Sequence, residues 1–290
     1  MKIKFYTPSY EGADDVFGAA TFGFVGAENE REPNAVELLH ELEGDMVCGT
    51  YEDCLKKIEA LPKREWQVGI VLFGNAGGEN AFLRELSARV RIPLVGGGAA
   101  ICPKTGKSAL LTGHAQVAVL LVCDDRYEFE VERENIHHDI LGENEITFED
   151  PRRIEAIDGE EPCAWLKREK ARLGLDVEDF EHLTFADAHG NNAHLSLADG
   201  RICSGRDLEN KMYLRYVAPD AVFDRMQSFY DDENAIVFGC AGLRGILDKN
   251  MKARGMGLFL FGEVCTKDGK SEFANLMLSK LRILPKKIRL

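Results

Sequence analysis

Three side chains able to do chemistry follow two short apolar runs in the C-terminal part of the chain. Cys240 and Arg244 come after residues 235–238, and Glu263 comes after residues 257–261. A guanidinium and a carboxylate complement the two charged ends of an α-amino acid, so the pair Arg244 and Glu263 fits such a ligand. The alternative is a salt bridge between them that closes a loop. Cys240 has a nearby arginine, as nucleophilic cysteines do, but a free cysteine in an apolar strand is usually a core residue.

These side chains meet only if the two apolar runs are neighbouring parallel strands. Their length and flanking glycines favour buried strands over helices. Residues 243–253 between them have apolar side chains at helical spacing, which predicts a short crossover helix. A crossover makes the strands parallel, so their carboxyl ends share the sheet edge where open α/β sheets bind ligands. Gly239 and its small neighbours would let backbone N–H groups approach the ligand.

The same segments resemble a known family. Phe238-Gly-Cys-Ala-Gly-Leu-Arg244, then Gly257-Leu-Phe-Leu-Phe-Gly-Glu263, then Asn275 are similar to the C-terminal half of the FIST family (F-box and intracellular signal transduction proteins). Val95-Gly-Gly-Gly-Ala-Ala100 and Ile154-Glu-Ala-Ile-Asp-Gly-Glu-Glu-Pro162 are similar to its N-terminal half.

The resemblance covers most of the chain, with residues 1–45 the least typical. It implies a FIST N-like domain at 1–165 and a FIST C-like domain at 166–290. It also implies a sensory module for a small ligand, with amino acids as the proposed ligands, and no established catalytic activity.

An internal repeat predicts the architecture. Residues 71–77 are similar to 237–242, and 102–108 are similar to 265–271, in the same order and at close to the same separation. This predicts a strand–loop–helix–strand–hairpin unit in each half, with chance similarity of turn residues as the alternative. We expect an α/β fold with mixed sheets, helices packed on the sheet faces, and two similar halves that divide near residue 165.

Two glycine-rich stretches add candidate ligand contacts. Residues 74–78, which include Asn75, join a predicted strand to a helix, and their N–H groups could receive an anion; a tight turn is the alternative. Residues 96–98 suggest a bulge that opens room in the sheet, at Gly97, for a ligand or for the backbone of the other half.

Apolar periodicity predicts the surrounding elements. Helices are expected at 51–61, 79–89, 162–173 and 219–229, and a further one around 32–42. Strands are expected at 66–73, 92–101, 114–123 and 124–133.

Composition excludes several classes of function. The excess of 49 acidic over 36 basic residues gives a net charge of −13, which repels nucleic acid and anionic membranes. No apolar run reaches the roughly 18 residues of a membrane span, and the start has no signal-peptide core, so a cytoplasmic location is expected. Neither the eight cysteines nor the histidines have metal-site spacing, so no metal or cofactor is expected.

The sequence therefore favours a cytoplasmic sensor of amino acids or similar small zwitterions that signals through a partner protein. The candidate ligand-binding residues are Gly239, Cys240, Arg244, Glu263, Asn275, Asn75 and Gly97. The alternatives are a small-molecule enzyme with Cys240 as its nucleophile and a protein–protein interaction scaffold without a ligand.

Overall fold

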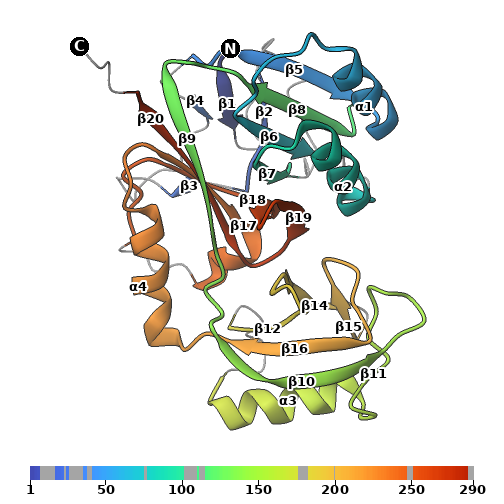
Figure 1. Ribbon diagram of the computed structural model, residues 1–290. Coiled ribbons are helices and arrows are strands. Elements are labelled where there is room, and N and C mark those ends of the chain that lie inside the picture. The colour runs from blue at the N-terminus through green and yellow to red at the C-terminus, as the bar shows by residue number, and fades with distance from the viewer. Residues whose placement is uncertain are drawn as a thin grey trace.

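Two main sheets make up the computed structural model, and the chain passes twice between them (Figure 1). The described residues are 1–6, 17–22, 24–25, 35–37, 41–74, 77–100, 110, 115–175, 182–198, 200–246 and 251–286.

The large sheet has the strand order β5-β8-β6-β7-β18-β17-β20-β9, and β3 and β19 pair with β18. Its strands are β3 (Phe24–Val25), β5 (Gly44–Gly49), β6 (Val68–Phe73), β7 (Leu94–Gly98), β8 (Val117–Val122), β9 (Tyr127–Glu134), β17 (Ala235–Cys240), β18 (Met256–Lys267), β19 (Lys270–Ala274) and β20 (Leu278–Pro285). A small sheet beside it is formed by β1 (Ile3–Tyr6), β2 (Phe17–Ala20) and β4 (Ala35–Glu37).

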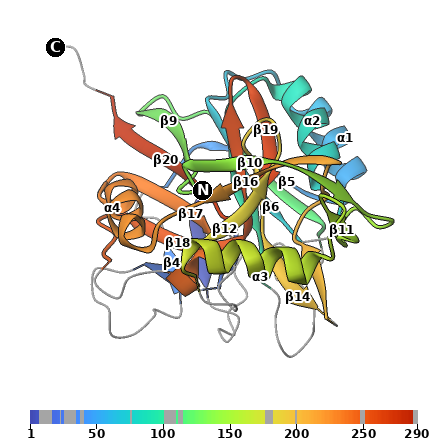
Figure 2. The ribbon, with the colours of Figure 1, turned by 90° about the horizontal axis from the view of Figure 1, so that it is seen from below.

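Residues 136–217, here called the smaller unit, form a separate sheet below the large one in Figure 1. Its order is β11-β10-β16-β12-β13, from β10 (Asp139–Thr147), β11 (Ala156–Ile157), β12 (Leu183–Ala186), β13 (Asn192–Ala193) and β16 (Lys211–Tyr216). Helix α3 (Pro162–Leu173) covers the face turned away from the large sheet (Figure 2). The hairpin of β14 (Leu195–Ala198) and β15 (Arg201–Ser204) lies on the facing side (Figure 1).

Successive side chains on a strand point to opposite faces of the large sheet, so each face packs into a layer of its own. On β6, Ile70 and Leu72 point into a central core, whereas Val71 and Phe73 pack against α1 (Tyr51–Ala60) and α2 (Glu79–Val90). On β17, Phe238 joins the central core and Val237 packs in a second cluster with α4 (Pro219–Tyr230). The predicted α/β fold, with mixed sheets and helices on the sheet faces, is confirmed.

The order of parallel and antiparallel strand pairs in the large sheet is the same from either edge. From β5 inward the pairs are antiparallel, antiparallel and parallel, and from β9 inward they are again antiparallel, antiparallel and parallel. The two central strands, β7 and β18, pair antiparallel. A duplicated unit would produce this pattern, and the duplication itself stays a prediction.

The domain boundary predicted at residue 165 falls inside α3, in the smaller unit. Strands β10 and β16, which lie on opposite sides of that boundary in the sequence, pair along their length.

Two predicted helices are wrong in the described residues. Residues 35–37 form β4, which pairs antiparallel with β1, so strand pairing prevails over local helix signals. Between β17 and β18 the described residues form a 3₁₀ helix, η1 (Ala241–Ile246), and 251–253 are not helical, while 247–250 lie outside the described residues. Gly242 and Gly245 weaken an α-helix there. No helix in the described part of the chain has the length and apolar character needed to cross a membrane.

Candidate functional site

The parallel pairing of β17 with β18 brings Cys240 and Glu263 together, as predicted from the sequence. Cys240 ends β17 opposite Leu260, and Glu263 lies three residues further along β18. The loop after β19 completes a buried cluster, because the Met277 N–H donates to Glu263 Oε2 at 3.3 Å and Asn275 is only 2% exposed.

Burial sets the charge of this cluster. It raises the pKa of the Glu263 carboxyl well above its ordinary value, although the neighbouring Cys240 thiol, the Met277 N–H and the charge of Arg133 oppose the shift. Burial and the Glu263 carboxyl also raise the pKa of the Cys240 thiol, despite backbone N–H groups of Leu276, Gly242 and Gly262 beside its sulfur. Burial therefore favours the uncharged forms of both the Glu263 carboxyl and the Cys240 thiol.

Several polar atoms of the cluster lack hydrogen-bond partners among the described residues. They are Glu263 Oε1, Asn275 Oδ1 and the Tyr230 hydroxyl, all on side chains at most 2% exposed. Leaving a buried polar group unsatisfied costs about 1–3 kcal/mol. Such a group in a folded protein calls for a specific explanation, such as a binding or catalytic role.

Close backbone approach holds these side chains in place. A Cβ added to Gly205, in the smaller unit, would stand 2.8 Å from Asn275 Oδ1, and one added to Gly262 would stand 2.8 Å from Asn275 Nδ2. A Cβ on Gly242 would stand 2.8 Å from Cδ2 of His194, whose pKa burial lowers. His194 and Gly205 were not predicted to lie here, because both come from the smaller unit, which is distant in the sequence.

The other predicted residues lie elsewhere. Arg244 is exposed on η1 and donates to the carbonyl oxygen of Phe22, while Glu263 is fully buried, so the two do not line a common open crevice as predicted. At Gly97 the backbone of β18 takes the room that a side chain would need, because an added Cβ would collide with the Gly262 carbonyl. Asn75 lies outside the described residues.

An open cavity of ≈ 350 Å³ lies beside the buried cluster, between α2 and the smaller unit. Gly205, which covers Asn275, is part of its wall. The lining residues are Gly77, Gly78, Glu79, Asn80, Ala81, Arg84, Arg152, Gly205, Arg206, Asp207, Leu208, Glu209, Phe261 and Phe273. We call this cavity the cleft. Ligand sites are often found at such boundaries between structural units.

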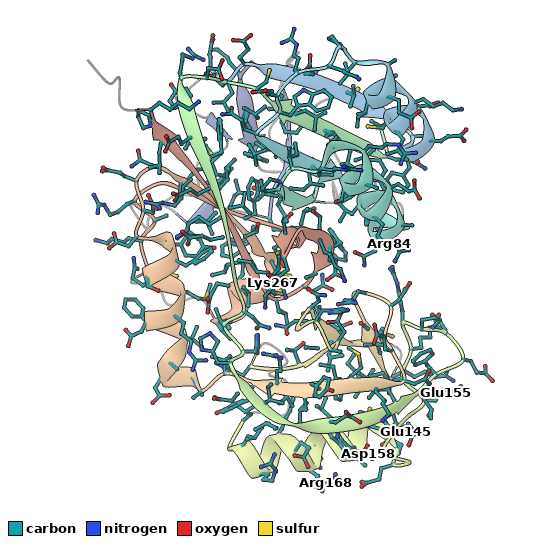
Figure 3. All side chains as sticks on the ribbon, viewed as in Figure 1. Arg84, Glu145, Glu155, Asp158, Arg168 and Lys267 are labelled. Carbon is teal, nitrogen blue, oxygen red and sulfur yellow. The ribbon has the colours of Figure 1, made fainter. Side chains whose placement is uncertain are left out.

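The large-sheet side of the cleft carries a helix N-terminus and an arginine, together with the Glu79 carboxylate, which accepts from the Gly77 N–H at 2.9 Å. Helix α2 begins after Gly78 without a side-chain cap, so its first N–H groups present a partial positive charge. Arg84 lies in the middle of α2 and lines the cleft from the large-sheet side (Figure 3). Among the described residues it has no hydrogen-bond or ion-pair partner.

The opposite side of the cleft is held by paired charges. Arg206 donates to Asp187 Oδ2 at 2.9 Å and to the Asn191 carbonyl at 3.0 Å. Arg152 donates to Asp207 at 2.8 Å. Glu209 adds a further carboxylate to this wall, so the cleft offers groups of both charges.

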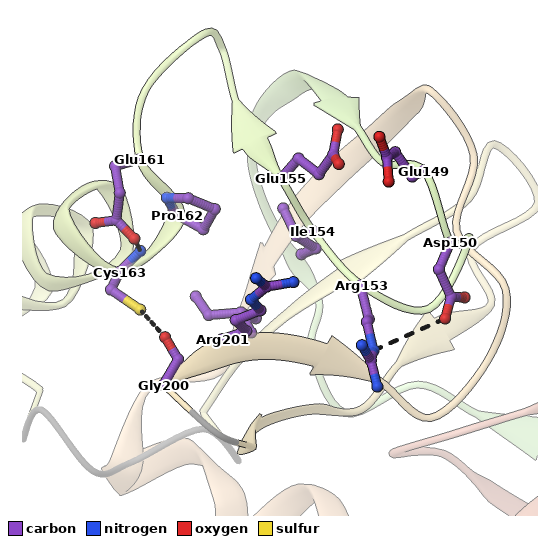
Figure 4. A pocket seen from close by; sticks show the side chains of 11 residues that line it. Glu149, Asp150, Arg153, Ile154, Glu155, Glu161, Pro162, Cys163, Gly200 and Arg201 are labelled. Carbon is purple, nitrogen blue, oxygen red and sulfur yellow. Dashed lines mark hydrogen bonds and ion pairs between the residues drawn. The ribbon is translucent and has the colours of Figure 1, made fainter.

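A cavity of ≈ 410 Å³ on the smaller unit is larger but has less of the character of a site (Figure 4). Its Glu161 caps α3 by accepting from the N–H groups of Cys163 and Ala164, and its Asp150 pairs with Arg153 at 3.8 Å. None of the candidate residues from the sequence lines it.

The described residues contain no group of three or more His, Cys, Asp or Glu side chains arranged to hold a metal ion. The sequence matches no protein-family model, and no curated protein is similar to it. The resemblance to FIST proteins therefore stays a prediction.

Proposed function

We propose that this protein is a cytoplasmic sensor that binds a small zwitterion of the amino-acid class in the cleft and signals through a partner protein. The observation that carries the proposal is the composition of the cleft, in which a helix N-terminus without a side-chain cap and an arginine unpaired among the described residues face a wall with carboxylates. The resemblance to FIST proteins supports the sensory role and the ligand class.

The charged groups on the two walls of the cleft determine the orientation of the proposed ligand. Its carboxylate binds the first N–H groups of α2 and the Arg84 guanidinium, which has no partner among the described residues and can form a charge-assisted hydrogen bond. Its ammonium faces Glu209 and Asp207 on the opposite wall. The cleft, at ≈ 350 Å³, is near the lower end of the roughly 300–1,000 Å³ of small-molecule sites, which suits one amino acid.

The buried cluster supports this role more than it supports an enzyme. A nucleophilic cysteine acts as its thiolate, whereas burial raises the pKa of Cys240 and keeps its thiol neutral. Asn275 links the large sheet to the wall of the cleft. Its side chain packs on Gly205, and its backbone N–H donates to the Asn192 carbonyl at 3.1 Å.

The test is a thermal-shift screen of the purified protein against the amino acids, followed by calorimetry on any hit. A ligand at 100 times its Kd should stabilise the fold by about 2.7 kcal/mol. Arg84→Ala should weaken binding by about tenfold or more, since a hydrogen bond to a charged group contributes about 1.5–3 kcal/mol.

Arg89→Ala is the matched control, because Arg89 lies on the same helix but pairs with Glu59 and Glu85. No shift with any amino acid, in a well-folded protein, would reject the proposal and favour the scaffold alternative. Equal loss of binding in both variants would place the ligand outside the cleft.

A further inference from the structure

Phe261 is exposed in the middle of a buried strand. Strand β18 is buried from Gly257 to Leu260 and again from Gly262 to Cys265, but Phe261 between them is 38% exposed. An aromatic side chain left in water forgoes a large part of its hydrophobic stabilisation, so this position needs a reason.

A β-bulge produces this exposure. The pairing of β18 with β7 shifts register between Phe261 and Glu263, and Gly262 adopts φ +71°. A bulge re-aims a side chain and is often found next to a functional site. Here it turns Glu263 into the buried cluster and leaves Phe261 on the wall of the cleft.

The neighbouring residues extend this apolar wall. Phe273 and Leu208, each 5% exposed, also line the cleft. Phe273 is fixed by an edge-to-face contact with Phe73, at 5.6 Å between ring centroids. The cleft thus has a rigid apolar surface next to the α2 N-terminus and Arg84.

A buried polar side chain without a partner among the described residues lies behind this wall. Asn275 is 2% exposed, its Oδ1 has no partner among the described residues, and it points at the Gly205 backbone that lines the cleft. The Gly205 backbone packs over that oxygen, which is buried from solvent.

We propose that the ligand is an amino acid with an aromatic or large apolar side chain, which packs against Phe261 while its carboxylate binds at Arg84 and the α2 N-terminus. This inference rests on the proposed function and narrows its ligand class. It predicts that ligand affinity depends both on apolar contact between the ligand side chain and Phe261 and on the charge of the ligand carboxylate.

The experiment is calorimetry of the full chain with phenylalanine, leucine, alanine, glutamate and lysine, and with phenylalaninamide, which lacks the carboxylate. Phenylalanine should bind about 10- to 100-fold more tightly than alanine, as expected for burying a large apolar side chain. Phe261→Ala should remove most of that preference. Arg84→Ala should weaken phenylalanine binding but not phenylalaninamide binding.

Ile140→Ala is the matched control, because Ile140 is an exposed apolar residue of the smaller unit, 58% exposed, that does not line the cleft. A folded Phe261→Ala protein, checked by circular dichroism, that still prefers phenylalanine would overturn the inference. Equal affinity for all five amino acids would overturn it too, while leaving the proposed function intact. Binding of none of them would reject the proposed function itself.

Discussion

Asn275 Oδ1 lies 2.8 Å from the point where a Cβ on Gly205 would stand, so a loop of the large sheet fits directly against the backbone of the smaller unit. The Asn275 side chain is also held from the other side by Gly262 and has little room to move. The joint between the two units therefore depends on the absence of a side chain at residue 205.

Gly205→Ala should destabilise the protein by about 1–3 kcal/mol, because the added methyl overpacks a buried amide. Chemical denaturation followed by circular dichroism measures the loss. Gly142→Ala is the control, since an added Cβ at Gly142 meets nothing within 4 Å. Equal stability of wild type and Gly205→Ala would show that the joint opens freely.

Glu263→Gln should change the pH dependence of stability. Because burial raises the pKa of Glu263 in the folded state, the native protein binds a proton that the unfolded chain releases above its ordinary pKa of about 4.3. This term makes wild-type stability fall as the pH rises from that value up to the folded pKa. Glutamine carries no such proton, so the variant should gain stability over wild type with rising pH, by up to about 1.4 kcal/mol per unit.

Urea denaturation of both proteins at several pH values between 5 and 8 gives the measurement. A stability difference that stays constant over this range would mean that Glu263 is ionised in the folded protein. In that case the charge of Arg133 would outweigh the burial of the carboxyl.

Arg206→Ala should be strongly destabilising, because it leaves the Asp187 carboxylate without its cation. The two side chains are 12% and 3% exposed, and removing one partner of a buried ion pair costs about 3–5 kcal/mol. Arg168→Ala removes a pair with Glu160 in which both side chains are about half exposed, and it should cost at most about 1 kcal/mol. Similar losses in the two variants, measured by denaturation, would contradict a structural role of Arg206 at the cleft wall.

The sequence correctly predicted the part of the site that is formed by segments close together in the chain. The apolar runs, the spacing between them and the short connection were enough to predict that β17 and β18 are parallel and that Cys240 and Glu263 lie close together. The same pattern did not predict that Glu263 would be fully buried or that Arg244 would remain at the surface. The burial of Glu263 follows from the bulge at Gly262, which apolar periodicity does not reveal.

The cleft was not predicted, because its two walls are far apart in the sequence. Arg84 is on α2, whereas Gly205 and Arg206 follow β15 in the smaller unit. Their approach depends on how the smaller unit is placed against the large sheet, and no local pattern records that placement. The exposed Phe261 likewise looked like one more core residue of an apolar strand.

The rate at which the Cys240 thiol is alkylated tests whether the buried cluster is chemically reactive. It is 4% exposed, and burial with the Glu263 carboxyl raises its pKa, so its thiolate fraction falls about tenfold for each unit of that rise. Brief treatment of the native protein with iodoacetamide at pH 7.5, followed by peptide mass spectrometry, should label the partly exposed Cys48 and Cys123 first and leave Cys240 unmodified. Treatment in urea should label Cys240 as well, which shows that the thiol is free. Labelling of native Cys240 as fast as that of Cys123 would mean an accessible thiolate, and the enzyme alternative would then be favoured over a sensor.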